Sequence, residues 1–271
     1  MVDRAGFEPA TPRLRTRFSD VYLFVSRFLS NSFYSEFYSW LVNSRGVSVG
    51  WARNVLRYLR KPLCDRRDSI LAYRLALHFI NVKYGVEVSR FLEKLKTKQS
   101  TPDLRIPDYN DVLKTYEKIR MLGNDKLLLF FKLLLATGLR QTEICLLLSD
   151  LERLYSMDYK DFVVYRIQWL RGNKKVFYAF IPKYIELKRM TLNNTYYTCM
   201  AKRHNLVAAK YIRKFVATKM FELGLSAEII DFIQGRTPRS ILIRHYLNLL
   251  PTATKEYKKY ATWLKEFLQL K

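Results

Sequence analysis

Helical periodicity is the feature that most restricts how this chain can fold. Apolar residues recur at three- and four-residue steps, the spacing that places them on one face of an α-helix. The stretches with this pattern are 18–31, 35–44, 49–61, 68–85, 86–96, 110–121, 125–138, 210–224 and 226–234. We therefore expect a mainly α protein whose helices bury their apolar faces against one another.

The helical pattern stops at TKQSTPDLRIPDY, residues 97–109. Two prolines, Pro102 and Pro107, and a polar composition are typical of a linker between domains. A chain of 271 residues is long enough for two domains. We predict an N-terminal tail over 1–17, a helical domain over 18–98, a linker over 99–107 and a second domain over 108–271.

One segment of the second domain has the composition of strands. The stretches DFVVYRIQWL and KVFYAFIP are rich in β-branched and aromatic residues, and RGNK separates them. Glycine followed by asparagine suits a tight turn, so Gly172 and Asn173 predict a β-hairpin. The fold expected is mainly α, with two domains and a small β-hairpin or sheet.

The net charge favours a polyanionic partner. Lys and Arg number 48 against 24 Asp and Glu, which leaves +24. Nucleic acid and anionic membrane are the candidate partners of such a chain. The best candidate for a membrane span, LLLFFKLLLA, is short and contains Lys132, so it predicts a buried helix. We expect a cytoplasmic protein that binds nucleic acid and does not enter a membrane, because the N-terminus has no apolar signal segment and the cysteines are few and unpaired.

Metal and nucleotide cofactors are not indicated. The three histidines, His78, His204 and His245, have no metal-ligand spacing, and His78 lies inside an apolar helix, which predicts a core residue. The acidic stretch DLERLYSMDYKD reads as a loop that leads to the hairpin. No glycine-rich phosphate loop is present. We expect no metal and no cofactor.

Five polar or aromatic residues indicate a function only when they are considered together, in their order along the chain. Arg140 directly follows a helix that ends at a glycine, and Glu143 comes three residues later. Lys210 and Arg213 project from the polar face of a later helix. Tyr246, in RSILIRHYLNLL, shares an apolar stripe with neighbouring leucines, so on its own it predicts core packing.

Taken in order, TGLRQTE, RGNKK, KYIR, QGR and HYL resemble the catalytic domain of tyrosine recombinases, the integrase family of site-specific DNA recombinases. The family carries T-G-L-R-x-x-E, a hairpin lysine, H-x-x-R, L-G-H and then a tyrosine. The similarity spans roughly residues 105–250, and TGLRQTE is its most specific block. Lys210 and Arg236 stand where the family usually has histidines, a replacement that looks like the fuselloviral branch of archaeal virus and plasmid integrases.

The resemblance implies a set of residues that cleave DNA through a 3′-phosphotyrosyl intermediate, without metal or ATP. Arginines can fork two phosphate oxygens each, a tyrosine hydroxyl can attack phosphorus, and a lysine can protonate the leaving 5′ oxygen. The implied site consists of Arg140, Arg213, Lys210 and Arg236 as phosphate ligands, Tyr246 as nucleophile, Lys174 as general acid and Glu143 as the residue that orients the arginines. Lys175 is the alternative general acid, and Arg171 occupies a further alignment.

The resemblance also implies partners. The N-terminal helices would form a core-binding domain that clamps double-stranded DNA, and four copies would assemble on DNA, associated with the nucleoid. The amphipathic C-terminal segment 252–271 can bury Tyr260, Trp263, Leu264 and Phe267. It packs on its own domain or docks on a neighbour, and the resemblance implies the second, an oligomerisation helix.

Two other functions share parts of this pattern. A type IB topoisomerase or a resolvase would use the same chemistry, but a topoisomerase needs no paired sites. A non-catalytic DNA-binding relative would form no covalent adduct. Separately, Gly6-Phe7-Glu8-Pro9 can be encoded by the T-arm sequence of a tRNA gene, which archaeal integrases commonly target, so we expect this segment to be translated attachment site or an ordinary tail.

Overall fold

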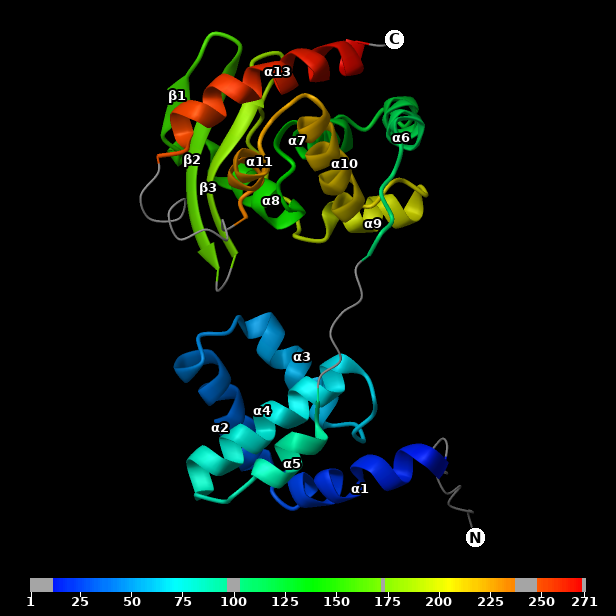
Figure 1. Ribbon diagram of the computed structural model, residues 1–271, viewed down its shortest axis with the longest axis vertical. Coiled ribbons are helices and arrows are strands. Elements are labelled where there is room, and N and C mark those ends of the chain that lie inside the picture. Colours follow the sequence, from blue (N-terminus) through cyan, green and yellow to red (C-terminus); the bar gives the residue numbers. More distant parts are fainter. Residues whose placement is uncertain (1–11, 97–102, 172–173, 237–247, 270–271) are drawn as a thin grey trace. The chain divides into compact units, whose positions relative to one another are not determined.

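The chain folds into two units, each with its own hydrophobic core (Figure 1). The computed structural model describes residues 12–96, 103–171, 174–236 and 248–269. Unit 1 spans Met1–Pro102 and unit 2 spans Asp103–Lys271, so the division falls inside the stretch predicted as linker. The expected class, mainly α with a small antiparallel sheet, is confirmed.

In the described residues of unit 1 every regular element is a helix. Its elements are α1 (Pro12–Ser26), α2 (Asn31–Ser39), a π-helical turn (Trp40–Ser44), α3 (Val49–Leu59), α4 (Arg67–Tyr84) and α5 (Ser89–Lys94). Serines begin two of these helices, because the Ser30 and Ser48 side chains accept hydrogen bonds from backbone N–H groups of the first turn. Helix α1 begins at Pro12, so residues 12–17, predicted as tail, are helical.

Helix α4 is the most buried element of unit 1. Ala72, Tyr73, Ala76, Leu77 and Ile80 are each fully or almost fully removed from solvent, and an aromatic cluster that includes Phe33, Phe37 and Phe79 packs beside them. The expectation that His78 is a core residue is wrong. Its side chain lies on the exposed side of α4, because it falls outside the buried stripe of that helix.

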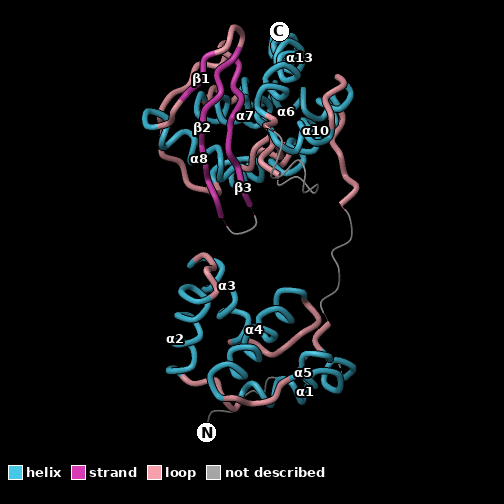
Figure 2. Tube along the Cα trace, turned by 60° about the vertical axis from the view of Figure 1, so that its left-hand side comes forward, coloured by secondary structure: helices cyan, strands magenta, loops and turns pink. Residues whose placement is uncertain are grey.

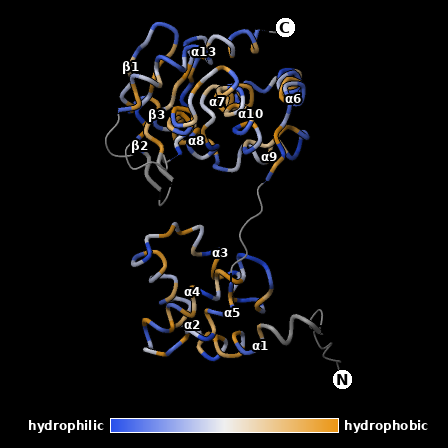
Figure 3. The backbone as a smooth tube through the Cα atoms, viewed as in Figure 1, coloured by the Kyte–Doolittle hydropathy of each residue, from blue (hydrophilic) through white to orange (hydrophobic). Residues whose placement is uncertain are grey.

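Unit 2 combines helices with one sheet. The helices are α6 (Tyr109–Met121), α7 (Asp125–Thr137), α8 (Gln141–Asp150), α9 (Tyr196–Arg203), α10 (Ala209–Glu222), α11 (Ala227–Ile233) and α13 (Leu250–Gln269). The apolar α7, which carries Lys132 at a half-buried position, contributes most of its residues to the core, and both units show apolar segments along the chain (Figure 3). Across the described residues, no helix is both long and apolar enough to cross a membrane.

The predicted hairpin is confirmed and belongs to a three-stranded antiparallel sheet, β1-β2-β3 (Figure 2). Strand β2 (Phe162–Arg171) pairs with β3 (Lys174–Pro182), and a one-residue shift of register between Arg166 and Trp169 marks a bulge at which Gln168 has a φ of 47°. Strand β1 (Ser156–Asp158) was not expected. The stretch read as a loop contains this strand and a 3₁₀ turn (Leu151–Arg153), because pairing with β2 overrides its weak strand pattern.

The C-terminal helix α13 packs on its own domain. Tyr257, Tyr260, Leu264 and Phe267 are buried there. The Tyr260 hydroxyl donates to the Leu135 carbonyl at 2.7 Å, and the Tyr257 hydroxyl lies 2.9 Å from the Ala136 carbonyl and 3.0 Å from that of Phe180. In the single chain the helix thereby supports the last turn of α7.

Candidate active site

The candidate site begins at the turn between α7 and α8, where TGLR is located. The buried Thr137 hydroxyl donates to the Leu133 carbonyl at 2.7 Å and accepts from the Leu139 N–H at 3.1 Å. Gly138 ends α7 with a φ of 57°, a conformation that glycine adopts without strain. The buried Leu139 holds the turn to the core. As a result, Arg140 lies directly before the first residue of α8.

Glu143 binds Arg140 through both of its carboxylate oxygens. One oxygen accepts from the Arg140 backbone N–H at 2.7 Å, as an acidic residue in the first turn of a helix commonly does. The other accepts from Arg140 Nη1 at 2.5 Å. The Glu143 side chain is 1% exposed and that of Arg140 is 29% exposed. The carboxylate therefore fixes the direction of a guanidinium that still reaches solvent.

Arg213 enters the same site from α10. Its Nη1 donates to the Gly138 carbonyl at 2.9 Å and lies 3.9 Å from the Glu143 carboxylate. Burial, followed by the nearby guanidinium groups of Arg140 and Arg236, lowers the pKa of Arg213 to about 9, while Glu143 opposes that change. Arg213 remains a cation at neutral pH. Its Nη2 is buried and has no hydrogen-bond acceptor in the described structure.

Gln234 and Gly235 close the site from the end of α11, and the sequence did not point to either as a functional residue. The fully buried Gln234 amide donates to the Arg213 carbonyl at 3.0 Å. The same side chain packs against Gly138, where an added Cβ would lie 2.4 Å from Gln234 Nε2. The Gly235 carbonyl accepts from Arg140 Nη1 at 3.3 Å. A signal existed, because a glutamine in a buried helical stripe requires a polar partner.

Arg236 and Lys210 lie at more exposed positions than the two arginines. Arg236 donates to Asp231 of α11 at 3.2 Å, and its side chain is 40% exposed. Arg236 is close enough to Arg213 to lower the pKa of that residue. Lys210, on the first turn of α10, is 64% exposed and pairs with Asp103 at 2.9 Å. The structure thus joins Arg140, Glu143 and Arg213 directly, places Arg236 nearby, and gives Lys210 a different partner.

Three of the predicted residues cannot be placed with their side chains. Tyr246 lies in 237–247, outside the described residues, as does the adjacent His245. The backbones of Lys174 and Lys175 begin β3, opposite Arg171 and Leu170 of β2, but their side chains are outside the description. The described residues therefore show the arginine side of the predicted site.

The joined residues suit the binding of an oxyanion. Two guanidinium groups and one carboxylate leave a net positive charge in a partly buried setting, and guanidinium donors form forked, charge-assisted hydrogen bonds with phosphate. Within the described ranges no group of three or more His, Cys, Asp or Glu side chains is arranged to hold a metal ion.

Comparison with known proteins gives one family match. The model of the family described as archaeal phage integrase matches residues 104–263. Among solved structures, a lambda integrase tetramer bound to a Holliday junction aligns with 13% identity and a TM-score of 0.49, over 88% of this chain and 84% of that chain. XerA recombinase aligns with 16% identity and a TM-score of 0.38, over 91% and 92%. No curated protein matches the sequence.

Proposed function

This chain belongs to the archaeal phage integrase family and is a tyrosine site-specific recombinase, and from that premise we propose that Arg140 and Arg213 bind the scissile phosphate of double-stranded DNA while Tyr246 attacks it. The matched segment, 104–263, contains all three residues. The roles of the individual residues are our assignment, because they rest on motif position and on the contacts described above.

One observation carries the proposal, namely the state of the Arg213 guanidinium. Its side chain is 11% exposed, its Nη1 is bound to the Gly138 carbonyl, and its Nη2 is buried without an acceptor in the part of the chain described. A buried charged donor without an acceptor is costly, of the order of 1–3 kcal/mol. A phosphate oxygen would satisfy this donor. The hydrogen bond from Arg213 Nη1 to the Gly138 carbonyl keeps the guanidinium in position for that oxygen.

The proposed reaction conserves the phosphodiester bond energy. The Tyr246 oxygen attacks phosphorus and the bond from phosphorus to the 5′ oxygen breaks, which leaves a 3′-phosphotyrosyl link and a 5′-hydroxyl. The leaving oxygen takes a proton from Lys174 or, as the alternative, from Lys175, and the Tyr246 proton passes to solvent or a nearby base. A 5′-hydroxyl of a partner strand then attacks the phosphotyrosine, which rejoins DNA and frees the tyrosine.

The remaining cations would complete the phosphate site. Arg236 can reach an oxygen by leaving the exposed ion pair with Asp231, which costs little because exposed pairs are weak. Lys210 can do the same from its pair with Asp103. Glu143 does not react in this scheme, since it is buried and engaged with Arg140, and it serves to orient the guanidinium.

The partners proposed are DNA attachment sites and further copies of this chain. The net charge of +24 supports contact with many phosphates in the nucleoid. We propose a tetramer that exchanges strands through a Holliday junction and integrates a viral or plasmid genome, with a tRNA gene as the target suggested by Gly6-Phe7-Glu8-Pro9. The C-terminal segment, which buries its apolar face on its own domain in the single chain, would dock on a neighbouring copy in that tetramer.

A covalent trapping experiment tests the proposal. Nicked duplexes of random sequence release a short strand after cleavage, so a 3′ adduct cannot be reversed. Wild-type protein should form an adduct that survives denaturation by detergent, and Tyr246→Phe should form none. Adducts with both proteins, or with neither, would reject Tyr246 as the nucleophile. Sequencing the trapped DNA would also reveal the site recognised.

A further inference from the structure

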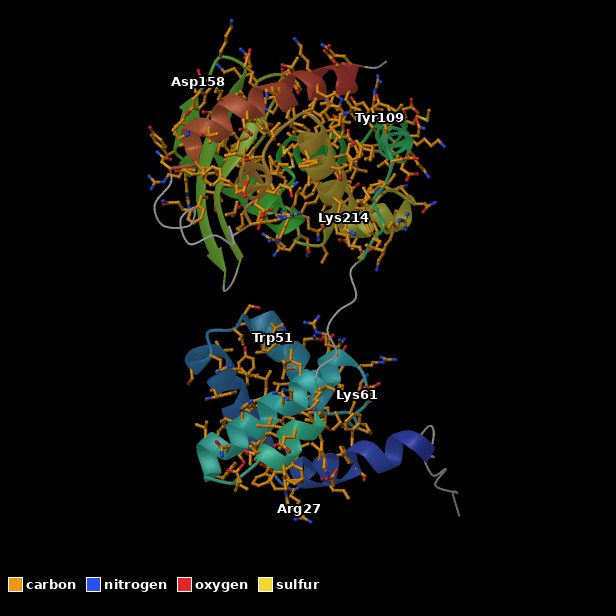
Figure 4. All side chains as sticks on the ribbon, in the orientation of Figure 1. Arg27, Trp51, Lys61, Tyr109, Asp158 and Lys214 are labelled. Carbon is orange, nitrogen blue, oxygen red and sulfur yellow. The ribbon has the colours of Figure 1, made fainter. Side chains whose placement is uncertain are left out.

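The end of the interdomain linker is bound to the helix that carries Arg213. Lys214 of α10 donates to the backbone carbonyl of Asp103 and, at 3.0 Å, to that of Arg105. The Arg105 guanidinium lies 4.8 Å from the centre of the Tyr211 ring. Figure 4 labels Lys214 beside the segment that leads into α6. The first residues of unit 2 are therefore fixed along α10 by backbone and ring contacts.

Asp103 adds a contact of another kind, because its side chain is a carboxylate that faces two lysines. One oxygen accepts from Lys210 Nζ at 2.9 Å and the other lies 3.5 Å from Lys214 Nζ. The hydrogen bond with Lys210 and the adjacent positive charges lower the pKa of Asp103 to about 2, and the same contact raises the pKa of Lys210. The pair is thus fully charged at any pH at which the protein would act.

Lys210 is the residue of this pair that has a proposed role with DNA. It precedes Arg213 by three residues, so the two side chains lie on neighbouring positions of one helix face. Lys210 touches Asp103 and the Tyr211 ring, at 4.4 Å from the ring centre, instead of the arginines. An exposed ammonium on a flexible stem can change partner without moving the helix.

We propose that Asp103 is a positioning residue, the anion that Lys210 exchanges for a DNA phosphate when the active site is occupied. This inference rests on the proposed function, because it takes DNA phosphate as the competing ligand. An exposed ion pair is weak, whereas a phosphate between Arg140 and Arg213 presents several charged oxygens at once. Asp103 therefore makes each binding event an exchange of anions on Lys210 and weakens contacts with DNA that do not engage this site fully.

The structure allows the exchange without loss of the linker contacts. Lys214 holds the backbone carbonyls of Asp103 and Arg105, and these acceptors do not depend on the carboxylate. Replacement of Asp103 by Asn therefore removes the charge but leaves the segment on α10. A suitable control is Asp161→Asn, because Asp161 pairs with Lys258 at 3.7 Å in the same unit and its loss changes the net charge equally.

The test is the salt dependence of binding to a short duplex of random sequence, measured by fluorescence anisotropy with the full chain. Each phosphate that a protein cation neutralises contributes about 0.9 to the slope of log K against log salt. If Asp103 competes for Lys210, Asp103→Asn should bind more tightly and steepen the slope by up to about 0.9. Asp161→Asn should keep the wild-type slope.

A second pair of variants links the effect to Lys210. Adding Asp103→Asn to Lys210→Met should change affinity and slope no more than Asp161→Asn does, because the exchanging cation is absent. Equal slopes for Asp103→Asn and Asp161→Asn, or an undiminished effect of Asp103→Asn in the Lys210→Met background, would overturn the proposal. Neither result bears on the covalent adduct with Tyr246, so failure here is distinct from failure of the proposed function.

Discussion

Arg213 donates a 2.9 Å hydrogen bond to the carbonyl of Gly138, two residues before Arg140. This bond fastens a cation of α10 to the turn that presents the other arginine. Gln234 completes the connection, since it donates to the Arg213 backbone and packs against Gly138. The geometry of the two guanidinium groups therefore depends on a few contacts among α7, α10 and α11, and each can be tested separately.

Gly138→Ala should be severely destabilising. A Cβ there would lie 2.4 Å from Gln234 Nε2, on a backbone with a φ of 57°. We expect strain of about 1–2 kcal/mol from the backbone and about 1–3 kcal/mol more from the overlap. Urea unfolding measures the change. Gly123→Ala, at a φ of 59° with nothing within 4 Å, should show the backbone cost alone.

A double variant separates the backbone strain of Gly138→Ala from the steric overlap with Gln234. Combining Gly138→Ala with Gln234→Ala removes the overlapping side chain, so the overlap energy should no longer add to the cost of Gly138→Ala. If the two substitutions are simply additive, the steric account of this turn is incorrect.

Glu143→Gln should reduce both stability and DNA cleavage. The carboxylate is 1% exposed and binds Arg140 twice, so its neutralisation leaves two guanidinium groups without their counter-charge. We expect a loss of about 1–3 kcal/mol, below the cost of breaking a fully buried pair because Arg140 retains contact with water. Urea unfolding measures the loss of stability, and single-turnover kinetics measure the loss of DNA cleavage. Glu222→Gln, in an exposed pair with Lys219, should cost less than about 0.5 kcal/mol.

The fold was predictable where periodicity is strong. The long apolar helices and the hairpin have patterns that need no knowledge of the neighbours. Strand β1 was missed, because three residues carry too little pattern and pairing with β2 decides their conformation. His78 was misassigned because an apolar helix still has a solvent face, and one position along the helix decides burial.

Tyr257→Phe tests the support that α13 gives to α7. The fully buried hydroxyl lies within hydrogen-bond reach of the Ala136 and Phe180 carbonyls, and its loss should cost about 1–3 kcal/mol at neutral pH. Tyr155→Phe, at a site 65% exposed, should stay within about 0.5 kcal/mol of wild type.

The same variant should alter the alkaline pH dependence of stability. Burial raises the pKa of Tyr257 well above its ordinary value of 10.0. Its neutral form is therefore favoured in the folded state, and the unfolded chain loses this proton first as pH rises above 10. The stability from Tyr257 is complete below that pH and then declines by up to about 1.4 kcal/mol per pH unit. Unfolding titrations should show a shallower decline for Tyr257→Phe, and identical slopes would contradict this assignment.

Lys174→Ala should abolish cleavage of ordinary DNA if Lys174 protonates the leaving 5′ oxygen. A substrate with sulfur at that bridging position has a better leaving group and needs little general acid, so it should restore cleavage by the variant. Lys175→Ala serves as the matched control and should cleave the ordinary substrate. Failure of the sulfur substrate to rescue Lys174→Ala would move the role elsewhere, most directly to Lys175.

The candidate site was partly predictable, for a different reason than the fold. Arg140, Glu143 and Arg213 could be named because their motifs are ordered, and the structure brings those three together. Gln234 was missed although it lies in the block QGR, because its role arises from contacts with residues distant in sequence. The pairing of Lys210 with Asp103 was equally invisible, because it joins a linker to a helix more than a hundred residues away.

The most direct test of the account identifies the amino acid that carries DNA after trapping. Adduct from the nicked duplex would be trimmed with nuclease, digested with trypsin and analysed by mass spectrometry. We expect a nucleotide on the peptide His245–Lys255, which contains Tyr246 as its single tyrosine among the 19 of the chain. A nucleotide on any other peptide, or on a serine or histidine, would contradict it.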